Sequence, residues 1–402
     1  MIPKLAKYSQ CSGCGACAAS CNVGALTMDY DKNGHLMPIV DESKCIKCGK
    51  CTKSCPILNE NRVNRNNPKD ISTYTAWAKD NNVCMQATSG GVFSQLAIDF
   101  LALPNATVYG AFLTDHNTCH HIEINDTKDL RLIVGTKYIQ SDASKVFPSI
   151  RKHLKNNDPC LFCGTPCQVA GLLSFLGKTN TENLYTIELI CHGVPNKTTS
   201  DIACKYYGAT NIVSYRDKAK GHKKGFSCTY KNSKGELLTF ANCIFSQIFG
   251  STDRPSCYKC KYARIDRVAD LTLGDQWGLH DKYPQRHKLG SNLIMCNSKK
   301  GERLLTANPN IEKDLNKNVT LNAPTLFMPV QTGATSNTAI MWLVKHLPVK
   351  MQFNILTNNW RKAPYLFPWM VLKRVNRFIY ERRFKAKLLK VRTELGWKND
   401  KL

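Results

Sequence analysis

Long apolar runs and acidic side chains are both scarce in this chain of 402 residues. No stretch approaches 18 unbroken apolar residues, so no membrane-spanning helix is expected. The segment before the first cysteine also lacks the apolar core of a secretory signal, and we therefore expect a cytoplasmic protein. In the reducing cytoplasm, cysteines act as metal ligands or redox groups more often than as disulfides. The 20 cysteines of the chain thus indicate metal or redox chemistry rather than a disulfide scaffold.

Acidic residues number 30 against 56 lysines and arginines, which gives a formal net charge of +26. Bound iron–sulfur clusters with their thiolates would lower this surplus without removing it. Such an excess favours an acidic partner: an acidic electron carrier such as ferredoxin, an anionic substrate, nucleic acid or an anionic membrane surface. Charge alone leaves all of these open.

The first 60 residues contain an internal repeat of cysteines. A C-x2-C-x2-C-x3-C run occurs twice, and the second copy lies 34 residues after the first. Three cysteines of such a run surround one 4Fe-4S cluster from a single tight loop, and the fourth ligates the other cluster. This rule predicts two clusters, one on Cys11, Cys14, Cys17 and Cys55, and one on Cys45, Cys48, Cys51 and Cys21. Zinc is disfavoured, because tetrahedral zinc does not require three evenly spaced cysteines.

The residues around these runs predict an α+β module with a ferredoxin-like fold. Apolar residues at 25–30 and 35–40 flank a turn with the sequence DKNG, which indicates a hairpin. Residues 61–70 are polar and without periodicity, and we expect them to form a linker. The sequence therefore places a two-cluster ferredoxin domain at residues 1–60.

From about residue 71, short apolar runs alternate with helical patterns, which is typical of an α/β region. Residues 159–163 predict a buried strand, followed by a helix at 167–176 with Thr165 as its N-cap and Pro166 as its first residue. Another helix is expected after Gly91. Further strands are predicted at 184–191 and 269–274.

A second set of cysteines falls at the expected ends of these elements. Cys167 lies in the first turn of a helix, where N–H groups and the dipole favour a thiolate or an anionic cluster. Cys191 ends a strand, and Cys257 and Cys260 form a C-x2-C pair. Because the carboxyl ends of strands in an open α/β sheet share one edge, these four cysteines could meet there and hold a third cluster. The residues leave two alternatives open, a zinc site or buried cysteines with one redox pair.

The remaining cysteines lack ligand spacing and are expected to be small buried hydrophobic residues. They are Cys84, Cys119, Cys160, Cys163, Cys204, Cys228, Cys243 and Cys296.

Residues 331–402 form a basic C-terminal segment. Its part from 369 to 395 contains neither proline nor glycine and predicts a long helix. Between residues 360 and 402 there are 13 lysines and arginines against 3 acidic residues. The helix is expected either to pack on the rest of the protein or to lie on an anionic membrane surface at the inner face of the membrane.

Seven motifs between residues 71 and 300 resemble, in order, the beta subunit of coenzyme F420-reducing hydrogenases and dehydrogenases and the related plant hydroxymethyl-chlorophyll reductase. They are TSGG at 88–91, GTKYIQS at 135–141, GTPCQ at 164–168, CHG at 191–193, YRDK at 215–218, RPSCYKC at 254–260 and GDQWG at 274–278. The resemblance divides the region into an N-terminal part, 71–150, and a C-terminal part, 151–330. Together with the ferredoxin module, this layout is similar to bacterial members associated with surface-polysaccharide synthesis.

The resemblance implies an FAD beside a cluster in an α/β flavin-binding reductase region, and it favours the third cluster over its alternatives. The turn at Ser89, Gly90 and Gly91 would offer N–H groups to the flavin pyrophosphate. The other residues expected to contact the flavin are Lys137, Tyr138, Gln140, Ser141, Gly164, Thr165, Gln168 and Asp275. His192 and Lys137 are the candidates for catalytic proton transfer.

These features predict an iron–sulfur flavoprotein oxidoreductase. Electrons would pass from a ferredoxin-type donor through 4Fe-4S clusters to FAD and on to an organic substrate that the sequence does not identify. One alternative is an electron-transfer subunit whose substrate site lies on another chain. A second alternative, a basic nucleic-acid-binding protein with structural clusters, is disfavoured because no groove-reading motif is recognisable.

Overall fold

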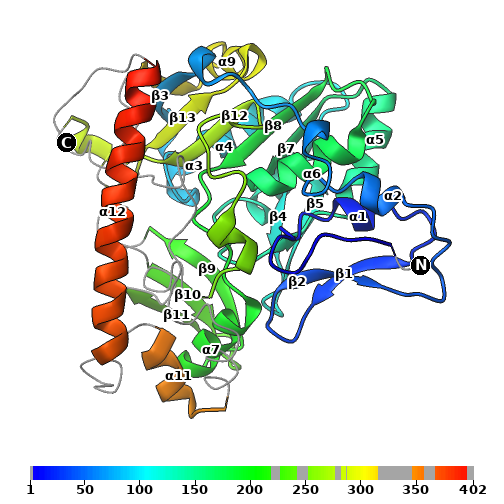
Figure 1. The fold of residues 1–402 in the computed structure, drawn as a ribbon. Coiled ribbons are helices and arrows are strands. Elements are labelled where there is room, and N and C mark those ends of the chain that lie inside the picture. The colour runs from blue at the N-terminus through cyan, green and yellow to red at the C-terminus, as the bar shows by residue number, and fades with distance from the viewer. Residues whose placement is uncertain are drawn as a thin grey trace.

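The computed structural model contains a small cysteine-rich module, a large mixed sheet covered by helices, and a second small sheet (Figure 1). It describes residues 3–218, 227–241, 252–276, 282–286, 288–315, 346–356 and 367–395. Cys243, and Trp277 and Gly278 of the GDQWG motif, lie outside the described residues.

The N-terminal module repeats its local structure as well as its cysteines. The short helices α1 (Ala16–Ala19) and α2 (Lys50–Lys53) each follow a glycine with positive φ, Gly15 at 85° and Gly49 at 72°. Glycine is required at such positions because a side chain would strain the left-handed backbone. Between the two halves, β1 (Leu26–Tyr30) and β2 (Leu36–Val40) pair antiparallel, which confirms the predicted hairpin.

The predicted linker is held against the larger region by hydrogen bonds. It contains two 3-10 turns, η1 (Glu60–Arg62) and η2 (Pro68–Asp70). Arg62 Nη2 donates to the Ser174 carbonyl at 3.0 Å, and Arg65 Nη2 donates to the Lys261 carbonyl at 3.0 Å. The segment therefore fastens the module to the larger region instead of separating the two.

The large sheet is mixed, with parallel strands at its centre. Its described strands are β3 (Ser72–Ala78), β4 (Thr107–Leu113), β5 (Cys119–Ile124), β6 (Ser141–Asp142), β7 (Cys160–Gly164), β8 (Leu184–Leu189), β12 (Leu271–Asp275), β13 (Asn292–Cys296) and β14 (Ile311–Leu315), in the order β14-β3-β13-β12-β8-β7-β4-β5-β6. The central strands β12, β8, β7 and β4 are parallel to one another, whereas β13, β3, β14 and β5 each pair antiparallel with a neighbour. The α/β prediction thus holds for the centre, and antiparallel strands extend it on both sides.

Helices cover both faces of this sheet. They are α3 (Asn81–Gln86), α4 (Val92–Leu101), η3 (Thr127–Leu132), α5 (Val146–Lys155), α6 (Pro166–Leu176) and α9 (Lys299–Thr306). Leu96 and Phe100 of α4 share one core cluster with Leu305 of α9. Phe147 and Leu172, from α5 and α6, belong to another core cluster.

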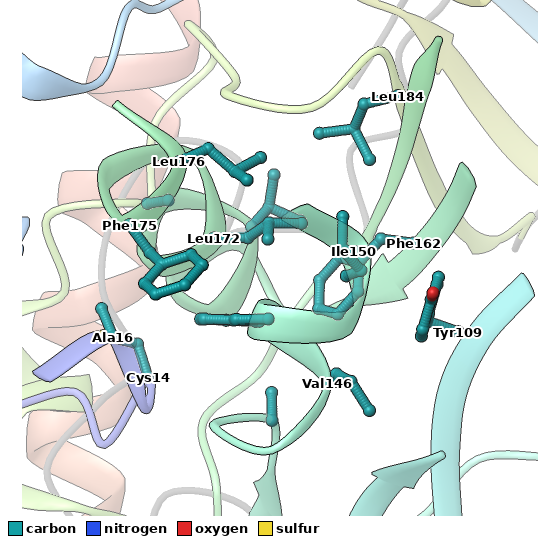
Figure 2. Packing of buried hydrophobic residues seen from close by; sticks show 14 of the residues in the cluster. Cys14, Ala16, Tyr109, Val146, Ile150, Phe162, Leu172, Phe175, Leu176 and Leu184 are labelled. Atoms are coloured by element: carbon teal, nitrogen blue, oxygen red, sulfur yellow. The ribbon is translucent and has the colours of Figure 1, made fainter. Parts of the chain in front are cut away.

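The N-terminal module contributes to the second of these cores. Cys14 and Ala16 lie in the same buried cluster as Phe175 and Leu176 of α6 (Figure 2). Ala16 is fully buried. Burial of apolar surface stabilises a contact by about 25 cal/mol per Å². The ferredoxin module is therefore packed into the core of the larger region, with α6 at the boundary.

The second sheet has the order β11-β10-β9 and its own core. Its strands are β9 (Asn211–Asp217), β10 (Ser227–Lys231) and β11 (Leu237–Ala241), and the helices α7 (Lys197–Tyr207) and α11 (Val349–Leu356) pack beside it. Tyr206 of α7 stacks on Phe353 of α11 with ring centroids 3.6 Å apart.

The predicted C-terminal helix is present as α12 (Phe367–Leu395), which runs along one side of the molecule (Figure 1). Phe384 and Leu388 are buried against Leu293 and Met295 of β13. The helix therefore packs on the rest of the protein, and its contact with an anionic membrane surface stays a prediction. None of the helices in the described ranges is both long and apolar enough to cross a membrane.

Candidate functional site

The first predicted cluster group is brought together by the fold. Cys11, Cys14, Cys17 and Cys55 all line one small cavity of about 20 Å³, beside apolar residues such as Ile57. Burial raises the pKa of Cys14 to about 12, and the neighbouring Cys11, Cys167 and Cys55 raise it further. Thiols with such raised pKa values stay protonated unless a bound cation stabilises the thiolate. The donor set and its apolar surroundings therefore suit a 4Fe-4S cluster.

The second predicted group lies nearer to solvent. Cys45 and Cys48 lie on the loop that leads into α2, where Cys51 is found. Cys21 is close enough to Cys51 for its charge to raise the pKa of that thiol, although burial is the larger cause. Cys48 is exposed, whereas Cys14, its counterpart in the first run, is buried. The edge of the module with the second group therefore faces outward.

The third set of cysteines converges from three distant parts of the chain. Cys167, Cys191, Cys257 and Cys260 all line one cavity of about 210 Å³. Cys167 follows Pro166 in the first turn of α6, and Cys191 comes two residues after β8. Cys257 lies in the 3-10 turn η5 (Pro255–Lys259), and Cys260 follows it directly.

The electrostatics of these thiols reflect their closeness. Burial raises the pKa of Cys191, and the neighbouring Cys167 and Cys260 raise it further. Burial also raises the pKa of Cys257, with smaller contributions from Asp253 and the other three cysteines of the set. The fold thus brings these four cysteines to one cavity, Cys167 and Cys191 from the ends of β7 and β8 and Cys257 and Cys260 from the segment before β12.

Two buried arginines line the same cavity. Arg254 is 2% exposed, and its Nε donates to Gln140 Oε1 at 3.1 Å, while its Nη2 donates to the Leu36 carbonyl at 2.5 Å. Arg267 is 3% exposed and forms an ion pair with the fully buried Glu188. The Nη2 atom of Arg267 has no hydrogen-bond partner among the described residues.

The lining of this cavity carries positive charge. Lys259 and Lys261 join the two arginines, and none of the lining residues within the described ranges is acidic. Arg267 is paired with Glu188 and Lys261 with Glu60, whereas no ion pair within the described residues balances Arg254. A buried cation needs a compensating negative charge, because transfer from water to a low-dielectric interior is costly. Four thiolates around an iron–sulfur cluster would supply that charge, so the donor set and the cations fit the predicted third cluster.

A site for a single metal ion differs in geometry from a site for a 4Fe-4S cluster. Among the residues that the structure describes, no three His, Cys, Asp or Glu side chains converge where one metal ion could sit. The four cysteine ligands of a 4Fe-4S cluster surround a metal cluster rather than a single ion. The third set lines a space of about 210 Å³, together with other residues such as Ser12, Ile57 and Tyr262.

The turn predicted to hold the flavin pyrophosphate is already occupied by protein contacts. Ser89 is buried, and its hydroxyl donates to the Ser291 carbonyl at 2.7 Å. The Val92 N–H, in the first turn of α4, donates to Asn292 Oδ1 at 3.3 Å. A Cβ at Gly90 would come within 2.9 Å of Asn292. These small residues therefore allow close packing against β13. The contacts involve the Ser89 hydroxyl and the Val92 N–H, so flavin binding by the N–H groups of the turn stays a prediction.

Several other predicted flavin residues form a hydrogen-bond network around α6. Gln168 Oε1 accepts from the Thr165 N–H at 3.0 Å, which completes the capping box of the helix. Gln168 Nε2 donates to the Ser141 carbonyl at 2.8 Å. Gly164 ends β7, where a Cβ would meet Phe162. The side chains of Thr165 and Gln168 thus have structural partners, as predicted for the helix cap.

Gln140 joins this network to the ferredoxin module. Its Nε2 donates to the Gly13 carbonyl at 3.2 Å, and its Oε1 accepts from Arg254. Of the residues predicted for the flavin, it is the one found in the lining of the 210 Å³ cavity.

The candidate proton-transfer residues, Lys137 and His192, both have lowered pKa values. Lys137 Nζ donates to the carbonyls of Ile133 and Val134, and burial lowers its pKa to about 8. His192 keeps exposed surface, yet the atoms packed around its ring lower its pKa, and nearby Asp275 opposes that shift.

Asp275 is engaged with Arg216, whose Nη1 lies 2.5 Å from Asp275 Oδ2. Tyr138 also lies beside Arg216 and contributes to the raised pKa of that arginine, after Asp275. These two predicted flavin residues therefore share one cationic neighbour at the end of β12.

Sequence reasoning missed the two arginines of the cavity. Arg254 lies within the RPSCYKC motif, but its partners Gln140 and Leu36 are 114 and 218 residues away in the chain. Nothing around Arg267 in the sequence marks it as buried. Only the fold reveals both roles.

Comparisons with known proteins agree with the motifs. Residues 158–315 match the family described as the C terminus of the coenzyme F420 hydrogenase/dehydrogenase beta subunit. Residues 10–59 match a 4Fe-4S dicluster domain, and residues 37–92 match a second description of such a domain. No curated protein matches the chain. The F420-reducing NiFe hydrogenase complex from Methanosarcina barkeri is similar over 75% of this chain and 93% of that chain, with 13% identity and a TM-score of 0.44.

The predicted resemblance is therefore confirmed at the level of the family. Residues 10–59 match a 4Fe-4S dicluster domain and residues 158–315 match the C terminus of the coenzyme F420 hydrogenase/dehydrogenase beta subunit, so this chain is an iron–sulfur electron-transfer protein of the oxidoreductase type that is related to that subunit.

Proposed function

We propose that this chain is an iron–sulfur flavoprotein oxidoreductase that takes electrons from a ferredoxin-type donor and delivers them, through three 4Fe-4S clusters and FAD, to an organic substrate. The observation that carries the proposal is the placement of the three cysteine groups. The second group lies toward solvent, the first is packed against α6, and the third lines a cavity that residues of the ferredoxin module also line, such as Ser12 and Ile57.

The first and third groups are direct neighbours. The charge of Cys167 contributes to the raised pKa of Cys14, and both of these cysteines contribute to that of Tyr262. A Cβ added at Gly171 of α6 would lie 3.0 Å from Cys14 Sγ. Bound at these sites, 4Fe-4S clusters supply one-electron transfer. The glycine lets the two ligand sets approach closely.

The residues around the third group would hold and stabilise its cluster. Cys167 sits at the N-terminus of α6, where the helix dipole favours negative charge. Arg254 adds a buried positive charge at the cavity wall, whereas the charge of Arg267 is balanced by Glu188. Positive charge near a cluster also raises its reduction potential, because reduction adds a negative charge.

Support for the flavin comes from two buried cations near the end of β13. Lys218 and Arg286 are 6% and 5% exposed. Within the described ranges, Lys218 Nζ donates to carbonyl oxygens, among them that of Ser89, and Arg286 donates to the Gly290 carbonyl and to Cys84 Sγ. An anionic pyrophosphate would compensate these charges.

Metal and flavin analysis of protein purified without oxygen tests the proposal. We expect about twelve irons, a matching amount of sulfide and one flavin per chain. About eight irons would remove the third cluster from the proposal. Lys218→Met should lower the flavin content while leaving iron unchanged, because the hydrogen-bond partners of this lysine among the described residues, the carbonyls of Cys84, Ser89 and Leu289, belong to none of the three cysteine groups.

A cysteine substitution locates the third cluster. Cys257→Ser should lower iron by about four per chain. Cys204→Ser is the matched control, since Cys204 is buried in α7 and belongs to another core. Equal iron in both variants would contradict the assignment of Cys257 as a ligand.

The alternative is an electron-transfer subunit without a substrate site of its own, and the engaged turn at Ser89 favours it. Full iron without flavin would support that alternative. Flavin in the isolated chain, together with turnover of an organic substrate by that chain, would exclude it. The association with surface-polysaccharide synthesis belongs to the proposal and rests on the resemblance alone.

A further inference from the structure

The two halves of the ferredoxin repeat differ in the residues that surround their cysteines. In the second run a lysine occurs at every third position, at Lys44, Lys47, Lys50 and Lys53. The corresponding residues of the first run, 34 positions earlier, are Gln10, Gly13, Ala16 and Ala19. The same cysteine spacing thus carries four charges in one half and none in the other.

The fold explains why the first half is small and uncharged. A Cβ at Gly13 would lie 2.7 Å from Arg254 Nη2, and Ala16 is fully buried. Ala19 packs against the core that the module shares with α5 and α6. A lysine at position 13 would be pressed against Arg254, and lysines at 16 and 19 would point into an apolar core; both are unfavourable. This half is the one that packs on the larger region.

The second half of the repeat is exposed to solvent. Residues 46–50 are exposed, and so is Lys53. Ile46 is 66% exposed, beside the exposed ligand Cys48. Lys44 pairs with Asp41 at 2.8 Å, whereas no carboxylate of the described residues lies within ion-pair distance of Lys47, Lys50 or Lys53. We call Lys44, Ile46, Lys47, Lys50 and Lys53 the lysine collar.

We propose that the lysine collar is the docking surface for a small acidic electron-carrier protein. The inference rests on the proposed function and names the place where electrons enter. Protein interfaces combine an apolar contact with a polar rim, and complementary charge mainly raises the association rate and selects the partner. Ile46 provides the apolar contact, and the lysines form a rim of one sign.

The position of the collar favours an acidic redox protein over other polyanions, such as nucleic acid or an anionic membrane. Its lysines alternate with the ligands Cys45, Cys48 and Cys51, so whatever binds the collar lies directly over the second group. One electron passes in each encounter: the carrier is oxidised by one electron and this chain is reduced by one. No bond is made or broken, and no proton needs to move.

Charge reversal of the collar tests this docking surface. The probe is a small acidic two-cluster ferredoxin, with its affinity for the iron-loaded chain measured by calorimetry under anaerobic conditions at low and at physiological salt. Lys47→Glu with Lys50→Glu should weaken binding at low salt by about tenfold or more and flatten its salt dependence, because steering by opposite charge is lost. The rate at which the reduced ferredoxin reduces the chain should fall in parallel.

A matched control makes the same change of charge, two lysines to glutamates, outside the lysine collar. Lys231 and Lys234 are exposed on β10 and the turn after it, within the second sheet. Lys231→Glu with Lys234→Glu should leave the affinity for ferredoxin within about twofold. Equal weakening by both variants would show a diffuse effect of net charge, and no weakening by the collar variant would remove the docking surface; either result overturns the inference.

A small neutral reductant separates this inference from the proposed function. If it reduces the collar variant as fast as the unmodified chain, the clusters are intact and the ferredoxin result concerns docking alone. If the unmodified chain lacks reducible clusters, the proposed function fails instead. Loss of binding to vesicles of anionic lipid, with ferredoxin binding unchanged, would assign the collar to a membrane and overturn the inference.

Discussion

The Nε of Arg254 donates a hydrogen bond to Gln140 Oε1 at 3.1 Å, and both side chains are buried where the ferredoxin module meets the larger region. The amide of Gln140 in turn donates to the Gly13 carbonyl. Arg254 Nη2 reaches the Leu36 carbonyl in β2. One arginine from the RPSCYKC motif therefore connects the third cysteine group to the loop that holds the first.

Arg254→Met should loosen the module from the larger region. It leaves buried acceptors without donors, and each buried unsatisfied group costs about 1–3 kcal/mol. We expect a loss of about 2–4 kcal/mol in the free energy of unfolding, measured by denaturant titration, and lower reduction potentials for the neighbouring clusters. Arg254→Lys should recover the charge but only part of the stability, because lysine cannot reproduce the planar set of donors. Equal stability of the methionine variant would show that the contact is incidental.

Glu188 and Arg267 form a buried ion pair, so removing one partner should destabilise the protein more than removing both. Glu188 is fully buried, and one of its carboxylate oxygens has no hydrogen-bond partner among the described residues. Arg267→Met should destabilise the protein by about 3–5 kcal/mol, since it leaves a buried carboxylate uncompensated. The double variant, Arg267→Met with Glu188→Leu, should be less destabilised than Arg267→Met alone. Thermal unfolding of the two variants measures the difference. A double variant less stable than Arg267→Met alone would show that the ion pair is not the dominant interaction of these two residues.

The parts of the site that follow from local chemistry could be predicted from the sequence. The capping box at Thr165, the first turn of α6 with Cys167, and the strand that ends before Cys191 each depend on neighbouring residues. The neighbouring carboxyl ends of β7 and β8 bring Cys167 and Cys191 together, as parallel strands predict. Cys257 and Cys260 precede β12, so their arrival at the same site depends on tertiary structure.

The parts that depend on distant side chains could not be predicted. Ser89 and Gly90 have the local pattern of a phosphate-binding turn, yet Asn292, about 200 residues later, fills the space beside them. Arg254 likewise takes its partners from other elements. A turn sequence specifies its backbone, but what occupies the space above it is decided by tertiary packing.

His121 makes stability depend on pH below neutrality. Its Nε2 lies 2.9 Å from the Cys163 carbonyl, so this atom carries the proton, and its Nδ1 accepts from the Ser141 hydroxyl at 2.8 Å. Burial lowers its pKa from 6.5 to about 4. The unfolded chain therefore binds more protons between these pH values, and stability falls as the pH drops below 6.5.

The contribution of His121 should amount to about 2 kcal/mol between pH 6.5 and 5. Denaturant unfolding of anaerobic protein at both pH values measures it. His121→Gln should remove most of this pH-dependent loss, whereas His116→Gln, at an exposed position, should leave it unchanged. An unchanged slope in His121→Gln would show that other groups cause the acid sensitivity.

Gly171 sets how closely α6 approaches the first cysteine group. In an isolated helix, replacing glycine by alanine gains up to about 1 kcal/mol. Here the added Cβ would lie 2.9 Å from Cys14 Cβ and 3.3 Å from its carbonyl oxygen, so the backbone of the cluster loop would have to move. Such overpacking costs about 1–3 kcal/mol and outweighs the gain in propensity.

Gly171→Ala should therefore lower the unfolding temperature and reduce the iron content by up to about four per chain, because Cys14 is a predicted ligand of the first cluster. The two readouts distinguish two effects. If the substitution only strains α6, the unfolding temperature falls and the iron content stays full; if it displaces Cys14, the unfolding temperature and the iron content both fall. A rise in stability with full iron would mean that the ferredoxin module can shift away from α6 at little cost, and the close approach of the first and third groups would then not be enforced by the fold.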